Sequence, residues 1–140
     1  EIKIAVGSAT PQDERYDIVI RGRDVASGLP KEITVRDVQV RVWLLRALRS
    51  IVESAKALIE STPPELVGDV YKNGVYVCGG GALLRGIDKL LEREIGVRVR
   101  ISDDAIRCVA RGAGMIADDL KIHQPILNTS ASLGFGKEIG

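Results

Sequence analysis

From residue 75 onward, the sequence alternates between short apolar segments typical of strands and longer segments with helical periodicity. Residues 75–78 predict a short buried strand, and residues 97–101 alternate like a second one. Between them, residues 82–94 place a row of apolar side chains on one helical face: Leu83, Leu84, Ile87, Leu90 and Leu91. Strand, helix and strand in this order imply a crossover connection. The fold class is therefore α/β, with flanking helices on a mixed or parallel sheet.

The ends of these helices are also marked. Gly96 suits the position after a helix C-terminus, where a left-handed conformation needs no Cβ. Ser102-Asp103-Asp104 predicts the cap of a last helix that runs to about Leu120. Because the pattern fades after His123-Gln124-Pro125, residues 123–140 are expected to form a flexible C-terminal tail.

The first part of the chain has a different character. Residues 1–36 predict a small antiparallel β unit, with strands near 2–6, 16–20 and 33–35 separated by turn residues. The chain begins directly in strand-like sequence, which suggests an excised domain. The domain organisation expected is a β unit over 1–36, an α/β region over 37–122, and the tail.

A long amphipathic helix is expected from about residue 36 to residue 61, where a Thr-Pro-Pro segment ends it. Thr34 to Asp37 resembles a capping box at its start. The first turns are ambiguous, because valines at 38, 40 and 42 also alternate like a strand. Pro64 suits the first turn of a second, short helix over 64–70.

The composition narrows the classes of function. Lys and Arg total 20 and Asp and Glu total 19, so the net charge of +1 gives no chain-wide basic field for nucleic acid. Aromatic residues are only 4% of the chain, too few for the stacking platforms of single-strand binders. Cys78 and Cys108 match neither a metal-binding spacing nor a disulfide framework, which favours a reducing cytosol. No apolar run approaches about 18 residues, and no signal peptide is visible.

The segment Cys78-Gly79-Gly80-Gly81-Ala82 is the strongest candidate for chemistry. It lies between a buried strand and a helix, and its glycines let a ligand approach the backbone with no Cβ in the way. In an open α/β sheet, ligands bind at this carboxyl end of the strands. The segment is neither a Walker A loop nor a GxGxxG fingerprint. A tight strand-to-helix connection with no ligand explains the same residues equally well.

Other features favour structural roles. Arg111-Gly112-Ala113-Gly114 fits close packing of the last helix, with Arg111 as a weaker candidate for a phosphate contact. Asp103 and Asp104 fit a helix cap better than a metal or acid–base pair. His123 is read as a surface residue. The sequence therefore contains no complete catalytic constellation and no metal site.

Residues 76–88, which read YVCGGGALLRGID, closely resemble the adenosine motif of the MreB family, the rod-shape-determining bacterial actins. Further similar segments lie on both sides of this motif, in the family's order and spacing, over about residues 1–122: Ile2-Lys3-Ile4, Gly7-Ser8-Ala9, Gly28-Leu29-Pro30, Thr62-Pro63-Pro64-Glu65-Leu66, Asp103-Asp104 and Cys108 to Gly114. The resemblance implies an actin-like ATPase (ribonuclease H-like) fold, here parts of subdomains IIB and IIA. It places Gly79, Gly80, Gly81 and Ala82 against the nucleotide and Lys3 beside the adenine.

The resemblance also implies a function for the whole protein. Such a protein binds ATP with Mg²⁺ and polymerises into filaments at the cytoplasmic face of the cell membrane. It acts with cell-shape and wall-synthesis proteins, and it contacts the membrane through regions not in this chain. The family's phosphate loops and catalytic carboxylate also lie outside this sequence. The parent protein is therefore expected to be an ATPase, whereas this fragment alone should bind ATP weakly or not at all.

Some residues depart from the family pattern. Ala105 stands where proline usually follows the two aspartates, and the glutamate that accompanies Lys3 is missing. Two other classes of function stay open. One is a sugar kinase or Hsp70-type ATPase of the same superfamily. The other is an interaction module that uses the 36–61 helix without a nucleotide.

Overall fold

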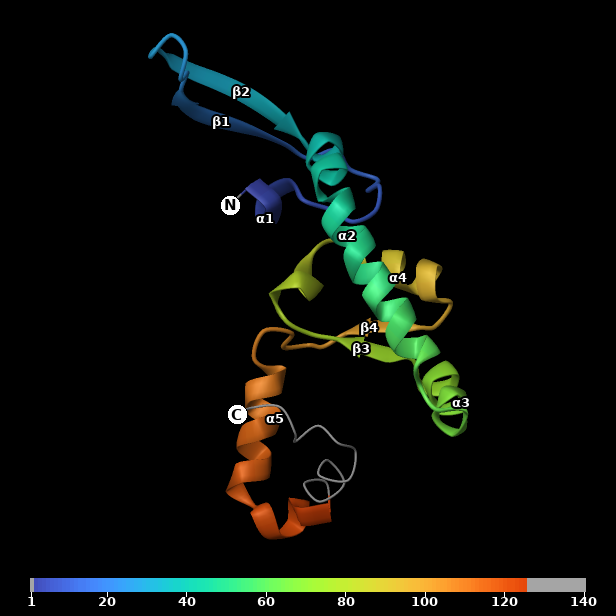
Figure 1. The fold of residues 1–140 in the computed structure, drawn as a ribbon. Helices are drawn as coiled ribbons and strands as arrows, with labels where there is room; N and C mark the ends of the chain where they lie inside the picture. Colours follow the sequence, from blue (N-terminus) through green and yellow to red (C-terminus); the bar gives the residue numbers. More distant parts are fainter. Residues whose placement is uncertain (1, 126–140) are drawn as a thin grey trace. The chain divides into compact units, whose positions relative to one another are not determined.

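The computed structural model describes residues 2–125, and Figure 1 shows their course. The chain divides into two compact units, Glu1–Ala105 and Ile106–Gly140. The first unit contains, in chain order, α1 (Ile2–Val6), β1 (Asp17–Arg23), β2 (Pro30–Arg36), α2 (Asp37–Glu60), α3 (Pro64–Asn73), β3 (Val75–Val77), the 3-10 helix η1 (Gly80–Leu83), α4 (Ile87–Ile95) and β4 (Val99–Ile101). The second unit contains α5 (Cys108–Asp118), followed by a helical stretch over 120–125.

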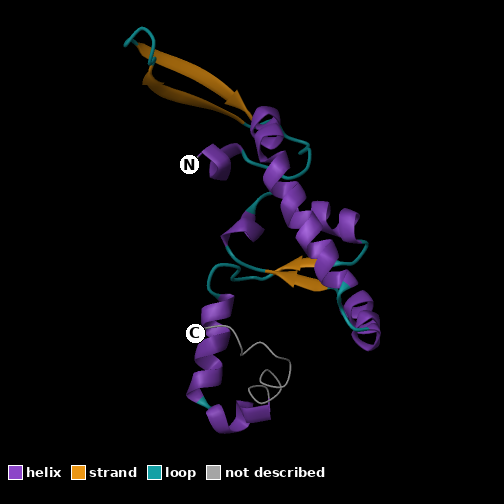
Figure 2. Cartoon of the chain, viewed as in Figure 1, coloured by secondary structure: helices purple, strands orange, loops and turns teal. Residues whose placement is uncertain are grey.

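β1 and β2 form an antiparallel hairpin, drawn as a pair of long strands in Figure 2. Ile18 pairs with Val35 and Ile20 with Ile33, so one face of the hairpin is apolar. The base of that face packs into a small core with Val6 and Val40. The antiparallel unit predicted for residues 1–36 is therefore confirmed for two of its three strands.

The strand expected at residues 2–6 is wrong, because these residues form the helix α1. Their alternation does not reflect a half-buried strand, since Ile4 is 83% exposed and Val6 is the buried residue. The amide of Gly7 donates to the carbonyl of Lys3 at 2.9 Å and closes the helical turn. Five residues are too few for periodicity to separate helix from strand.

α2 confirms the long helix predicted from about residue 36, including the ambiguous valine segment. Its buried residues are Asp37, Val40, Leu48 and Val52. The predicted capping box at Thr34 is wrong, because the helix begins two residues later than that pairing requires. The backbone amide of Arg36 instead donates to Oε1 of Gln39 at 3.0 Å. α3 confirms the short helix expected after Pro63 and extends to Asn73.

β3 and β4 form a parallel two-stranded sheet, and α4 lies between them in sequence, as the predicted crossover requires. The main core lies between this sheet, α4 and α2 (Figure 1), and contains the buried residues Ala9, Leu48, Val52, Ile87, Leu91 and Val99. Full burial of a leucine or isoleucine side chain contributes about 1.5–3 kcal/mol. This core therefore fixes α4 against α2 and sets the position of the segment between β3 and α4.

The helix expected over 82–94 begins later than predicted. Gly80–Leu83 form η1, and α4 starts only at Ile87, after Gly86 in the left-handed conformation at φ 73°. A Cβ on Gly86 would overlap the side-chain oxygen of Thr10, so the approach of the 8–12 segment imposes the break. At the other end, Gly96 is left-handed at φ 70°, as predicted.

The cap expected at Asp103 and Asp104 for the last helix is wrong. Residues 103–107 form turns, and α5 begins at Cys108 with Arg107 as its N-cap. A Cβ on Gly112 or Gly114 would meet no atom within 4 Å, so the described residues do not supply the close packing predicted there. His123, expected at the surface, is half-buried. Most of the predicted tail, from residue 126 on, lies outside the described residues.

Glu94 ties α4 to α2, and this contact predicts an acid-sensitive contribution to stability. Glu94 accepts from Arg93 at 3.0 Å and from Lys56 on α2 at 3.2 Å. The hydrogen bond from Arg93, followed by that from Lys56, holds the pKa of Glu94 below its ordinary value of 4.5. Because the folded-state pKa is lowered, the stabilisation is complete above pH 4.5 and is lost as pH falls through the folded-state value.

We therefore expect the difference in urea midpoint between the wild type and Glu94→Gln to shrink as the solution is acidified. Glu92→Gln, at an exposed position of the same helix, is the matched control and should show a smaller change with pH. A wild-type advantage over Glu94→Gln that stays constant from neutral to acid solution would contradict the prediction.

Candidate functional site

The predicted glycine turn follows β3 directly, at the carboxyl end of the parallel strands. The amide of Gly79 donates to the carbonyl of Ala105, in the loop after β4, at 2.5 Å. The loops after both strands are thus joined at this edge of the sheet, where open α/β sheets bind ligands. Gly79 has φ 86°, a conformation that side chains rarely adopt, so glycine is required there.

The space around the three glycines is open. A Cβ built on Gly79, Gly80 or Gly81 would meet no heavy atom of residues 2–125 within 4 Å, in contrast to Gly7, Gly74 and Gly86, where it would contact the chain. The part of the chain that the structure describes therefore does not require small residues at 80 and 81. The absence of side chains leaves the backbone accessible to a group from outside this chain.

Ala82 lies under the turn instead of on its open side. Its side chain is 4% exposed, and its amide donates to the carbonyl of Gly79 at 3.1 Å. Ala82 therefore supports the turn from the core. The predicted contacts of Gly79, Gly80, Gly81 and Ala82 with a nucleotide stay predictions.

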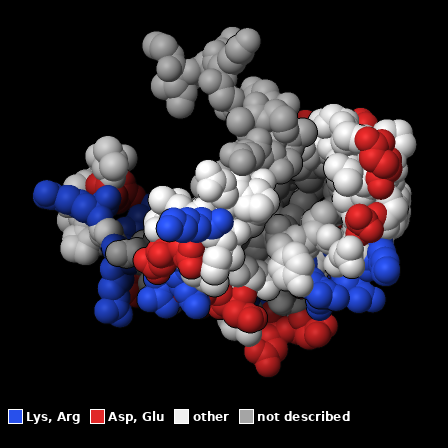
Figure 3. All heavy atoms as spheres, turned by 90° about the horizontal axis from the view of Figure 1, so that it is seen from below, with Lys and Arg blue, Asp and Glu red and all other residues white. Residues whose placement is uncertain are grey.

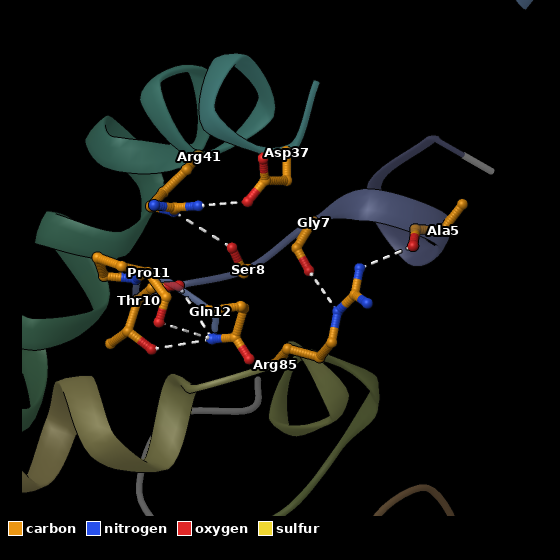
Figure 4. A network of polar contacts seen from close by, with 9 residues as sticks. All are labelled: Ala5, Gly7, Ser8, Thr10, Pro11, Gln12, Asp37, Arg41 and Arg85. Carbon is orange, nitrogen blue, oxygen red and sulfur yellow. Dashed lines mark hydrogen bonds and ion pairs between the residues drawn. The ribbon is translucent and has the colours of Figure 1, made fainter. Parts of the chain in front are cut away.

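Lys3, the remaining predicted nucleotide-site residue, is exposed on α1. Figure 4 shows how α1 is tied to the segment that follows the glycine turn. Arg85 donates from Nη2 to the carbonyl of Ala5 at 2.7 Å and from Nε to the carbonyl of Gly7 at 3.2 Å. The structure thus links the two predicted parts of the site through a residue that sequence reasoning did not single out.

Arg85 makes further contacts that fix this segment. Its guanidinium lies over the ring of Tyr16, 4.2 Å from the centroid. The hydroxyl of Tyr16 donates to Oε2 of Glu14 at 2.8 Å, which raises the pKa of Tyr16, and the charge of Arg85 partly opposes that rise. The sequence signal that could have pointed to Arg85 was the next residue, Gly86, because it is a glycine in the middle of the expected helix.

A second set of polar contacts, made by Arg41, lies beside the contacts of Arg85 (Figure 4). Arg41 on α2 donates from Nη2 to Oδ2 of Asp37 at 2.7 Å and from Nε to the hydroxyl of Ser8 at 3.2 Å. The side chains of Asp37 and Arg41 are 6% and 16% exposed, and Ser8 is 1% exposed. This buried ion pair anchors the 7–9 segment to the start of α2. Neither the burial of Ser8 nor the ion pair of Asp37 with Arg41 was predicted from the sequence.

The described residues contain no group of three or more His, Cys, Asp or Glu side chains that could hold a metal ion. The helices described include none that is long and apolar enough to cross a membrane. On the face drawn in Figure 3, acidic and basic side chains adjoin one another in small groups, as the nearly balanced charge leads one to expect. What characterises the candidate site is accessible backbone at three consecutive glycines that directly follow β3.

Residues 1–125 match the family model described as MreB/Mbl protein. The chain belongs to the MreB/Mbl family. It is 43% identical over 120 residues to the cell shape-determining protein Mbl of Bacillus subtilis strain 168, and 39% identical over 122 residues to the cell shape-determining protein MreB of Escherichia coli K12. These alignments cover 86% and 87% of this chain but only 36% and 35% of the relatives, so the chain spans about a third of their length.

Solved structures agree with this membership. The chain superposes on MreB5 of Spiroplasma citri bound to ADP with a TM-score of 0.79 and 38% identity, over 91% of this chain and 38% of the other. The corresponding values for MreB5 bound to AMPPNP are 0.77, 38%, 91% and 38%. The actin-like α/β fold expected from the resemblance is therefore confirmed, and the chain forms a fragment of it.

Proposed function

We propose that this MreB/Mbl chain supplies one wall of an ATP site in a bacterial actin-like cytoskeletal protein. The whole protein binds ATP and polymerises into filaments at the cytoplasmic face of the cell membrane, where it acts with cell-shape and wall-synthesis proteins. The backbone at Gly79–Gly81 contacts the nucleotide, and Lys3 lies beside the adenine.

The open space at Gly79–Gly81 is the observation that carries this proposal. A side chain would fit at positions 80 and 81 without touching the described residues, as it would at other glycines such as Gly22. Gly79–Gly81 differ from Gly22 because they are consecutive and follow β3 at the carboxyl end of the parallel strands, where open α/β sheets bind ligands, so a ligand explains these glycines better. The MreB5 structures that resemble this chain were solved with ADP and with AMPPNP. A nucleotide is therefore the ligand favoured for this space.

The chain's part in the mechanism is to bind and orient the nucleotide. In an actin-like protein the nucleotide lies between two domains, and its γ-phosphate couples to their closure and to contacts between subunits. The backbone at Gly79–Gly81 offers hydrogen-bonding groups at one side of such a cleft. The proposal assigns the nucleotide's metal ion to no residue of this chain.

Gly81→Val tests the proposal in the full-length protein. Because no heavy atom lies within 4 Å of the added Cβ, and because no positive φ strains it, the melting temperature should stay close to that of the wild type. The valine would occupy space that the nucleotide uses. We expect the Kd for ATP, measured by calorimetry, to rise by about 10- to 100-fold, which corresponds to about 1.4–2.8 kcal/mol.

The matched control is Gly22→Val, at another glycine with open Cβ space and no positive φ, on the distant β1. It should leave ATP affinity unchanged. Equal ATP affinity in the wild type and Gly81→Val would contradict contact at this turn. A wild-type protein that does not bind ATP would overturn the proposed function as a whole.

A further inference from the structure

Arg85 lies at the centre of a set of contacts that joins three segments of the first unit. Its side chain binds the carbonyls of Ala5 and Gly7, 80 and 78 residues earlier in the chain, and stacks over Tyr16. Its backbone carbonyl accepts from the amide of Ala9 at 2.7 Å, and its backbone forms a parallel bridge with Ser8. We refer to these contacts of Arg85 with residues 5–9 as the Arg85 clamp.

The clamp acts where α1 is weakest. The last carbonyls of a helix have no partner within the helix, and a helix of five residues has no intrinsic stability in water. The guanidinium of Arg85 supplies two donors and a positive charge at this C-terminal end, and both favour the helical conformation. The position of α1, and of Lys3 on it, therefore depends on a residue outside the helix.

The same clamp is closely connected to the glycine turn. Leu84, the residue before Arg85, donates from its amide to the carbonyl of Gly81 at 3.1 Å. The side chain of Leu84 would lie 3.2 Å from a Cβ on Gly7, so the residue after α1 also packs closely against the end of the turn. A short, hydrogen-bonded path thus connects Gly81 to α1.

We infer that Arg85 is a positioning residue of the nucleotide site, which holds Lys3 on α1 at a fixed distance from the Gly79–Gly81 turn. This inference rests on the proposed function, since it gives the clamp a role only if a nucleotide binds between these elements. Arg85 does not touch the nucleotide. Its effect on binding passes through the placement of Lys3, because an interaction at the adenine is effective only when the interacting group is held in place.

The test is a double-mutant cycle on Lys3 and Arg85 in the full-length protein, with ATP affinity as the readout. Arg85→Ala and Lys3→Ala should each raise the Kd for ATP by about tenfold, and the double variant should be hardly weaker than either one. Such non-additivity is the result that a merely structural role of Arg85 would not give. Independent effects would multiply to about a hundredfold.

Arg85→Lys provides a second variant in case Arg85→Ala does not fold, which circular dichroism would reveal. Lysine keeps the charge but lacks the planar guanidinium that donates to two carbonyls at once. The Kd for ATP should therefore rise by only about two- to threefold. This loss of affinity should also disappear when Lys3→Ala is already present. Arg93→Ala is the matched control, because Arg93 is an exposed arginine on α4 that pairs with Glu94. It should leave ATP affinity unchanged.

The outcomes separate the two proposals. If the wild type binds ATP and Arg85→Ala and Arg85→Lys bind it with the same Kd, the role of the clamp is overturned but the nucleotide site stays in place. If the loss of ATP affinity in an Arg85 variant multiplies with the loss in Lys3→Ala, Arg85 acts independently of Lys3. That result would also overturn the role of the clamp. A wild-type protein that does not bind ATP would overturn the proposed function and, with it, this inference.

Discussion

Replacing Asp37 with alanine is expected to lower the free energy of unfolding by about 3–5 kcal/mol, the usual cost of leaving a buried charge without its partner. The guanidinium of Arg41 would then keep only the hydroxyl of Ser8 among its described side-chain partners, while its side chain is 16% exposed. Urea unfolding followed by the fluorescence of Trp43, the single tryptophan of the chain and a residue of α2, measures the loss.

The hairpin offers a matched control for this prediction. Arg21 and Glu32 form an ion pair of similar length, 2.6 Å, but their side chains are 80% and 59% exposed. Glu32→Ala should therefore cost less than about 1 kcal/mol. Replacing both Asp37 and Arg41 by apolar residues should recover much of the loss, since no buried charge remains. Equal costs for Asp37→Ala and Glu32→Ala would show that burial of the pair does not matter.

Replacing Gly86 with alanine is the second large effect expected, about 3 kcal/mol of destabilisation. The left-handed conformation costs a residue with a side chain about 1–2 kcal/mol, and overpacking typically costs a further 1–3 kcal/mol. Both terms apply here, because Gly86 has φ 73° and its Cβ would overlap the side-chain oxygen of Thr10. The change in urea midpoint, read from Trp43 fluorescence, measures the sum.

Gly96→Ala separates the two terms. Gly96 has nearly the same conformation, φ 70°, but a Cβ there would meet nothing within 4 Å. Its replacement should therefore cost only the conformational term, about 1–2 kcal/mol. Thr10→Ala should partly rescue Gly86→Ala, since it removes the overlapping oxygen. If Gly86→Ala and Gly96→Ala cost the same, contact with Thr10 does not explain why the helix breaks at Gly86.

Periodicity predicted the elements that are long and one-sided. The 24 residues of α2 contain enough turns for their apolar face to outweigh the strand-like valines near its start. The order of β3, α4 and β4 followed from alternating patterns, and Gly96 followed from the local requirement of a helix end. The candidate site was proposed from the same kind of pattern, because an apolar strand that ends in three glycines is visible in the sequence alone.

The tertiary structure decided the conformation of residues 2–6 and the late start of α4. In both places a short segment is held by residues far away in the chain, such as Arg85 at α1 and Thr10 at Gly86. Local patterns record which side chains are apolar, but they do not record which distant carbonyl or hydroxyl a segment will meet. The burial of Asp37 with Arg41 was not predicted for the same reason. A charged residue is expected at the surface unless its buried partner is known.

The sequence by itself thus determined the fold class, the position of the glycine turn and the family resemblance. All three depend on the order and spacing of residues along the chain. Only the tertiary structure decided what surrounds the turn: open space at Gly79–Gly81, Ala82 beneath it, and Arg85 connecting it to the helix that carries Lys3. The contacts of Arg85 join segments about 80 residues apart, and their energies depend on three-dimensional approach, which no local pattern records.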